Sequence, residues 1–235
     1  MSAGCIPAPC PHGHRTRVPP RIATGYTRPV PPARLPQIKA PMAATEVARA
    51  FHRPGWVYEE KVDGWRVLTY KDAAGVRLVS RNGRELTRRF PELAAAVAAL
   101  EPPTLLLDGE IAVFDSQLLS HFEWIRGRPK DEPATPPTLI AFDCLYARGR
   151  DLRERPLRVR RNVLEELVDG HDLVLPARRL APDGLEAWAQ VRERGYEGLI
   201  GKDAASPYVE GRTLSWLKVK VPHYREGERG WEPKQ

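Results

Sequence analysis

Short apolar runs, separated by turn residues, dominate the chain after Met42. Alternating or continuous apolar runs of this length are typical of strands, whereas apolar residues three and four apart indicate helices. Strands are predicted at residues 56–61, 67–70, 76–80, 104–114, 138–145, 173–176, 199–202 and 216–221. Helices are predicted at 44–51, 91–100, 158–168 and 183–194, the last opened by a capping-box-like Asp183 and Glu186. Short strands with irregularly placed helices and no internal repeat predict an α+β domain built on antiparallel sheets.

Residues 1–41 lack this pattern and hold 10 of the 24 prolines. They are predicted to form a disordered, basic, Pro-rich arm before a globular domain at 42–221 and a loose tail at 222–235. The spacing of Cys5, Cys10, His12 and His14 in the arm fits no closed zinc template, which favours incidental residues over a metal site.

The composition indicates a globular protein and limits how it can bind nucleic acid. A hydrophobic fraction of 42% over 235 residues supports a sizeable core. With three cysteines, no secretory signal pattern and no apolar run near 18 residues, we expect a cytoplasmic protein without a membrane partner. The arm contains six basic residues and no acidic one, so the rest of the chain carries +1 of the net charge of +7. Any nucleic acid is therefore expected to bind the body through a local patch.

The segment from Lys61 to Arg66, KVDGWR, ends the predicted strand 56–61. A lysine here can act as a covalent nucleophile, and the following Asp-Gly pair favours a tight turn that presents it. An amine attacks only when neutral, and an unperturbed lysine has a pKa of about 10.4. Nearby cations would depress that pKa.

Two further strands carry polar residues at apolar positions. Asp108 and Glu110 interrupt the run 104–114, which is costly unless the acids are paired, metal-bound or at a cleft. The alternative is a bulge or strand end with solvated acids. Phe142 and Asp143 lie on opposite faces of the strand 138–145. Phe142 either stacks on a base or belongs to the core.

Charged residues mark the late strands and one early turn. Glu197 and Lys202 flank a short apolar strand, which alone is also compatible with an ordinary strand with charged ends. Lys218 and Lys220 share one face of a strand, where they repel unless an anion lies between them; the alternative is a solvated edge strand. Arg81, in an Arg-Asn-Gly turn, either contacts phosphate or belongs to a plain surface turn.

In their order along the chain, these motifs resemble the signature series of covalent lysine nucleotidyltransferases, which include ATP-dependent DNA ligases, RNA ligases and mRNA-capping guanylyltransferases. The segments WVYEEKVDGWR, SRNGRELTRRFPEL, LDGEIAVFD, FDCLY and EGLIGKDAASPYVEGRTLSWLKVK are similar to bacterial ATP-dependent DNA ligases, including those of double-strand-break repair. The resemblance covers about residues 41–221. It implies a nucleotidyltransferase domain, ATP-grasp-like, with antiparallel sheets flanked by helices.

The resemblance also implies a reaction. Lys61 would attack the α-phosphate of ATP, release pyrophosphate and form a lysyl–AMP phosphoramidate. The AMP would pass to a DNA 5′-phosphate, and the 3′-hydroxyl at the nick would displace it. Lys218 and Lys220, with Mg²⁺ or Mn²⁺, would stabilise the charge that builds on the α-phosphate.

Further roles follow from the same resemblance. Glu197, with Asp63, would ligate the metal. Seven residues would contact the nucleotide or its surroundings. Glu59 and the backbone near Glu60 would read the adenine edge, Phe142 would stack on adenine, and Glu110 would contact the ribose or the metal. Arg66 and Arg81 would contact ribose, phosphate or the nick 5′-phosphate, and Lys202 would lie near Lys61.

Full ligases of this kind continue into an OB-fold domain, for which residues 221–235 are too few, so no OB-fold is expected. Self-adenylation is expected to be slow and nick binding weak unless a separate OB-fold or repair-complex partner assists. The alternatives are an RNA ligase or capping-type enzyme, and a truncated pseudo-ligase that binds nucleotide or DNA without turnover.

Overall fold

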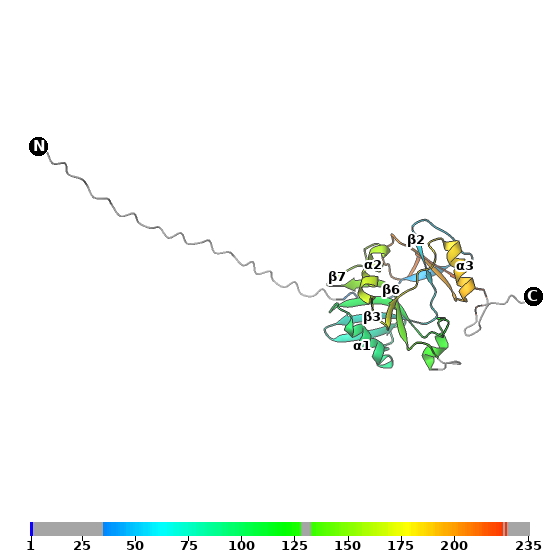
Figure 1. The fold of residues 1–235 in the computed structure, drawn as a ribbon, viewed down its shortest axis with the longest axis horizontal. Helices are drawn as coiled ribbons and strands as arrows, with labels where there is room; N and C mark the ends of the chain where they lie inside the picture. Colours follow the sequence, from blue (N-terminus) through cyan, green and yellow to red (C-terminus); the bar gives the residue numbers. More distant parts are fainter. Residues whose placement is uncertain (2–34, 128–132, 223, 225–235) are drawn as a thin grey trace, which may run out of the picture. The chain divides into compact units, whose positions relative to one another are not determined.

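The protein is described by a computed structural model that covers Met1 and residues 35–127, 133–222 and 224 (Figure 1). The strands in these residues are β1 (Ala43–Glu46), β2 (Trp56–Glu60), β3 (Trp65–Asp72), β4 (Gly75–Ser80), β5 (Leu105–Ala112), β6 (Thr138–Ala147), β7 (Arg150–Asp151), β8 (Val174–Pro176), β9 (Gly198–Asp203) and β10 (Arg212–Lys220). The helices are α1 (Pro91–Ala99), α2 (Leu157–Val168) and α3 (Gly184–Arg194), with 3-10 turns η1 (Thr87–Arg89) and η2 (Phe122–Arg126).

The strands form two sheets. The four-stranded sheet has the order β1-β10-β9-β2, and the six-stranded sheet has the order β4-β3-β5-β6-β7, with β8 paired to β6. Strand pairs are antiparallel except β1 with β10 and β6 with β8. The predicted α+β class with antiparallel sheets flanked by helices is therefore confirmed.

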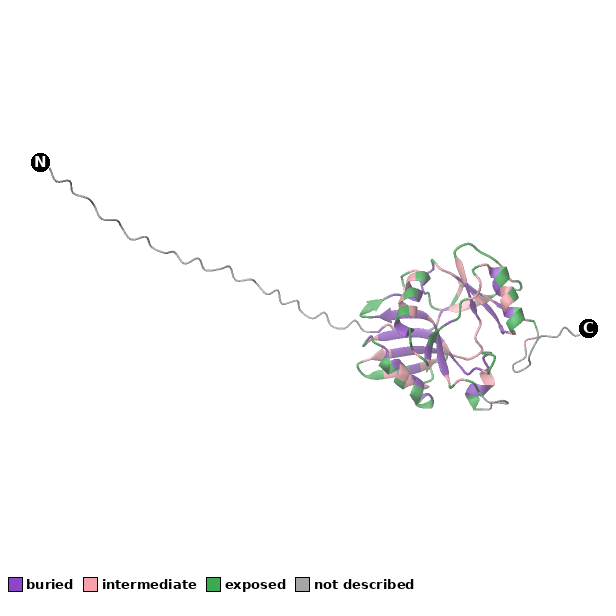
Figure 2. Ribbon diagram, in the orientation of Figure 1, coloured by how far each residue is buried: buried purple, intermediate pink, exposed green. Residues whose placement is uncertain are grey.

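Helices cover each sheet with an apolar face. Leu93 and Val97 of α1 and Leu164 of α2 pack into the main core, over strands β4 to β6 of the six-stranded sheet. Ala187 and Val191 of α3 pack against the four-stranded sheet. Figure 2 shows that β5 and β6, inside the six-stranded sheet, are largely buried. Each fully buried aliphatic side chain contributes about 1.5–3 kcal/mol, so these contacts fix the sheets that carry the polar residues.

Most predicted elements lie within a few residues of their expected positions, and Asp183 accepts hydrogen bonds from the amides of Leu185 and Glu186 at the start of α3. The helix predicted at 44–51 is wrong, because Ala43–Glu46 forms β1. This short strand pairs in parallel with β10, with Glu46 opposite Lys218. Pairing with a strand far along the chain overrides the local helical preference of alanine.

The packed part of the chain begins before Met42. Leu35 is buried and Ile38 packs against the same cluster, which includes Tyr70. The amides of Lys39 and Ala40 donate to Glu210. The described residues leave out residues 2–34 and 225–235. These ranges contain most of the predicted arm and tail, including the cysteines and histidines of the arm. Within the described part, no helix is long and apolar enough to cross a membrane.

Candidate active site

Lys61 lies where the chain passes from one sheet to the other. β2 of the four-stranded sheet ends at Glu60, and β3 of the six-stranded sheet begins at Trp65. The Lys61 amide donates to the Gly198 carbonyl at 2.9 Å. Gly64 runs so close to β5 that an added Cβ would lie 2.3 Å from the Ile111 oxygen. The Asp-Gly pair therefore makes a close approach to β5 that only glycine permits.

Glu197 joins two of the predicted catalytic lysines. One carboxylate oxygen forms an ion pair with Lys61, and the other lies 3.3 Å from the Lys220 ammonium. The Glu197 side chain is 8% exposed, and that of Lys61 is 21% exposed. The antiparallel pairing of β2 with β9 and of β9 with β10 brings the three residues together. Lys218, two residues before Lys220, instead pairs with Glu46 at 3.2 Å.

Glu110 of β5 lies close to the same lysine. Its carboxylate forms no hydrogen bond or ion pair with another described residue, and the residue keeps part of its surface exposed. Burial of its carboxylate raises its pKa to about 8, although the charges of Lys61 and Arg66 lower it. Asp63 and Asp108 raise it further. A cation or a ribose hydroxyl is the kind of group that such a carboxyl would take.

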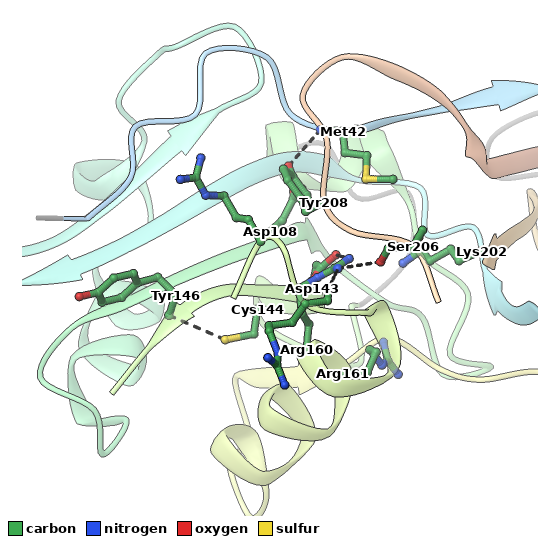
Figure 3. Close-up of polar contacts among 12 residues, drawn as sticks. Met42, Asp108, Asp143, Cys144, Tyr146, Arg160, Arg161, Lys202, Ser206 and Tyr208 are labelled. Atoms are coloured by element: carbon green, nitrogen blue, oxygen red, sulfur yellow. Dashed lines mark hydrogen bonds and ion pairs between the residues drawn. The ribbon is translucent and has the colours of Figure 1, made fainter. Parts of the chain in front are cut away.

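Asp108 is paired, as an acid in an apolar strand must be. Arg66 donates to its two oxygens at 2.9 and 2.6 Å, and Tyr208 donates at 2.7 Å. Arg66 also donates to the carbonyl of Met42 at 2.6 Å. Figure 3 shows Asp108 and Tyr208 beside Met42. The Arg66 guanidinium lies 5.1 Å from the ring centre of Phe142, so it borders the aromatic residue predicted to stack on adenine.

A second acid, Glu59, lies between two buried cations. Lys202 donates to one of its oxygens at 2.5 Å, and Arg161 of α2 lies 2.8 Å from the other. The ammonium of Lys202 is 4.5 Å from the ring centre of Phe142 and 4.4 Å from that of Trp216. Burial lowers the pKa of Lys202, while Glu59 opposes the shift. Glu59, Lys202 and Phe142 are thus brought into one cluster.

Asp143, on the other face of β6 from Phe142, pairs with Arg160 of α2 at 2.7 and 2.8 Å. Both side chains are fully buried, and Arg160 also donates to the Ser206 carbonyl at 2.9 Å, as drawn in Figure 3. Burial raises the pKa of Asp143, against the hydrogen bonds from Arg160.

The sequence reasoning missed Arg160 and Arg161 as partners of these acids. Their signal is their position, because they share the buried face of α2 with Leu157 and Leu164, at the spacing of an apolar stripe. Arginines at such positions must find acids or carbonyls inside the fold.

Two predicted residues lie apart from these clusters. Glu60 is on the opposite face of β2 from Glu59 and contacts Arg178 at 3.2 Å. Burial raises its pKa to about 7, although Arg178 lowers it. Arg81 is exposed in its turn, and its amide donates to the Arg66 carbonyl at 3.1 Å. Its side chain forms no hydrogen bond or ion pair with another described residue and is exposed, so it is open to a ligand.

Glu197 and Asp63 are the two carboxylates that the resemblance predicts as metal ligands. No group of three or more His, Cys, Asp or Glu in the described residues could hold a metal by itself. Mg²⁺, however, is usually held by one or two carboxylates together with substrate phosphates. Both oxygens of Glu197 are paired with ammonium groups, so Glu197, together with Asp63 and substrate phosphates, would hold Mg²⁺ only if the cation replaced Lys61 or Lys220 there.

Comparison with known proteins identifies relatives. The family model described as "ATP dependent DNA ligase domain" matches residues 36–220. The multifunctional non-homologous end joining protein LigD of Mycolicibacterium smegmatis is 35% identical over 205 residues, which are 83% of this chain and 26% of the relative. DNA ligase C1 of the same organism is 33% identical over 82% of this chain and 58% of its own length.

Solved structures of DNA ligases are also similar to this chain. A mycobacterial DNA ligase D complexed with ATP and MES matches with a TM-score of 0.67 and 36% identity. The match covers 77% of this chain and 60% of that chain. The ligase domain of Mycobacterium tuberculosis LigD matches with the same TM-score over 59% of its length. This chain spans about a quarter of the length of the LigD relatives.

Proposed function

The chain belongs to the family of ATP-dependent DNA ligase domains, and on that premise we propose that it adenylates itself on Lys61 and passes the AMP to nicked DNA. The observation that carries the proposal is the arrangement around Glu197. This carboxylate contacts both Lys61 and Lys220, so the candidate nucleophile and a candidate phosphate-binding lysine lie at one point. Three motifs far apart in the sequence converge there.

In the first step, the neutral amine of Lys61 attacks the α-phosphorus of ATP. A nitrogen–phosphorus bond forms, the bond from that phosphorus to the bridging oxygen breaks, and pyrophosphate leaves with its electron pair. The proton of the amine passes to solvent. Lys220 and Lys218 balance the charge that builds on the α-phosphate. In the later steps, the DNA 5′-phosphate takes the AMP from Lys61, and the 3′-hydroxyl then displaces AMP to close the nick.

The remaining site residues bind and orient the nucleotide. We assign the adenine to the cluster of Glu59, Lys202 and Phe142, and the ribose to Glu110. Arg66 lies over the Phe142 ring and holds it in place, and the exposed Arg81 contacts phosphate. Glu197 and Asp63 would hold Mg²⁺ or Mn²⁺, which when bound offsets the negative charge of the phosphates.

The names of the relatives point to the DNA substrate. Several are called non-homologous end joining proteins, so we assign this chain to double-strand-break repair in the bacterial cytosol. We also propose that an OB-fold or a repair-complex partner contributes to the grip on DNA.

Incubation with ATP labelled on the α-phosphate tests the first step. With Mg²⁺ or Mn²⁺, the wild-type chain should acquire covalent label, and Lys61→Ala should acquire none. Lys71→Met is the matched control, because Lys71 donates to carbonyls at the end of α1 away from this site. The Lys71→Met variant should be labelled like the wild type. GTP labelled in the same position should give little label, and nicked DNA, unlike nicked RNA, should then remove label from the protein.

Label that persists in Lys61→Ala would show that another residue is the nucleophile. Absence of label from the wild type with every nucleotide and both metals would contradict the catalytic proposal.

A further inference from the structure

The backbone that carries Lys61 is held by one side chain from a distant loop. The amide of Asp63 donates to the hydroxyl oxygen of Ser120 at 2.8 Å. The same short crossing is held at its start by the Lys61 amide on Gly198, and at its end by the close approach of Gly64 to Ile111. Ser120 therefore supports the middle of the crossing, between these two points.

Ser120 is itself firmly placed. It is 6% exposed and forms an isolated bridge with Phe114, just after β5. The loop between these residues closes on Asp115, whose carboxylate accepts the amides of Gln117 at 2.8 Å and Leu119 at 2.9 Å. A hydroxyl on such a rigid loop can fix the backbone that it contacts.

The loop is also closed after Ser120. The amide of His121 donates to the Val113 carbonyl at 3.0 Å, and its ring nitrogen Nε2 lies 3.0 Å from the Asp115 carboxylate. The hydrogen bonds of His121 and Asp115 leave the Ser120 hydroxyl facing the Asp63 amide. The loop thus connects the end of β5, which carries Glu110, to the turn that carries Lys61.

We propose that Ser120 is a positioning residue for the attack of Lys61, a role that rests on the proposed function. By accepting the Asp63 amide, it sets the backbone from which the Lys61 side chain extends. A nucleophile that is misplaced by about 1 Å can lose on the order of 10²-fold in rate. Loss of the hydroxyl should therefore slow the chemical step while the contacts that bind ATP remain.

Single-turnover self-adenylation tests this. Ser120→Ala should lower the maximum rate of labelling by about 10-fold or more, with the ATP concentration at half-maximal rate changed less than about 2-fold. Ser120→Thr keeps the hydroxyl and should recover at least half of the rate. Ser116→Ala, in the exposed part of the same loop, is the matched control and should behave as wild type.

Ser120→Cys serves if the alanine variant does not fold, since it keeps the size of the side chain but accepts hydrogen bonds weakly. It too should label slowly with an unchanged final extent of labelling. A purely structural role would instead lower the extent of labelling in parallel with the folded fraction, at an unchanged rate, and would overturn the inference. A wild-type rate in the folded alanine or cysteine variant, or a threonine variant as slow as the alanine one, would also overturn it. Absence of label in the wild type would instead contradict the proposed function itself.

Discussion

Lys61 and Glu197 form an ion pair although they are 136 residues apart in the sequence. The pair arises because β2 and β9 run antiparallel, with Glu60 opposite Leu199, so the residues that flank the two strands meet at one end of the sheet. The second oxygen of Glu197 takes Lys220 from the next strand. A single carboxylate therefore organises the two amines that the proposed reaction requires.

Replacement of this carboxylate should impair the chemistry more than the fold. We expect Glu197→Gln to lower the rate of self-adenylation by about 10²-fold or more, because the neutral amide has no charge with which to form ion pairs with Lys61 and Lys220 or to attract a cation. The rate of labelling with α-labelled ATP measures the effect. Glu193→Gln on the exposed side of α3 is the control, and it should label at the wild-type rate. A Glu197→Gln variant as fast as this control would exclude Glu197 from the reaction.

Gly64 should tolerate no side chain. Gly64→Ala would place a Cβ 2.3 Å from the Ile111 oxygen and 2.8 Å from the Cγ of Glu110, so the Lys61 turn must shift. We expect the labelling rate to fall by about 10²-fold.

Gly149→Ala gives a matched comparison for Gly64→Ala. Gly149, in the turn between β6 and β7, has a φ of +76°, but a Cβ added there would meet no atom within 4 Å. The Gly149→Ala substitution should lower the unfolding free energy by about 1 kcal/mol without lowering the labelling rate. Equal labelling rates in the two variants would show that the close approach at Gly64 has no catalytic role.

The buried pair of Asp143 and Arg160 should contribute strongly to stability. Asp143→Asn leaves the fully buried guanidinium without a charged partner, and the expected loss of unfolding free energy is about 3–5 kcal/mol. Urea denaturation measures it. Asp151→Asn removes the partner of Arg153 in an exposed pair and should cost less than about 1 kcal/mol. Similar losses in the two variants would mean that the buried pair is not structurally important.

Glu60 should make the protein less stable as the pH rises. Its pKa is about 7 in the folded chain, above the ordinary 4.5, because burial disfavours the charged carboxylate. The folded state thus binds the Glu60 proton more tightly, so the contribution of Glu60 to stability is fully present below pH 4.5 and is lost as the pH rises through 7. The shift corresponds to about 3 kcal/mol at most.

Glu60→Gln should remove most of this dependence. Between pH 5 and pH 8, the unfolding free energy of the variant should fall by about 2–3 kcal/mol less than that of wild type. Denaturation by urea at the two pH values tests this, with the exposed Glu92→Gln as the control. If wild type and Glu60→Gln respond equally to pH, Glu60 is ionised in both the folded and unfolded states.

Much of the candidate site could be found in the sequence, because its residues lie at strand ends and turns that follow local rules. The run before Lys61 predicts a strand, which is present as β2; where Asp63 and Gly64 predict a tight turn, the structure instead has a bend at Gly64 before β3. The acids within the apolar run of β5 required partners, and Asp108 has them. These inferences need only the alternation of a strand and the cost of a buried charge.

By itself, then, the sequence determined most of the strands, the antiparallel α+β class and the family to which the chain belongs. Only the tertiary structure decided that residues 43–46 form a strand, that Arg161 and Lys202 share Glu59, and that Ser120 reaches Asp63. The physical reason is that each of these depends on pairing between segments far apart in the chain. Local patterns specify that a buried charge or amide needs a partner, but the partner is selected by the packing of the two sheets.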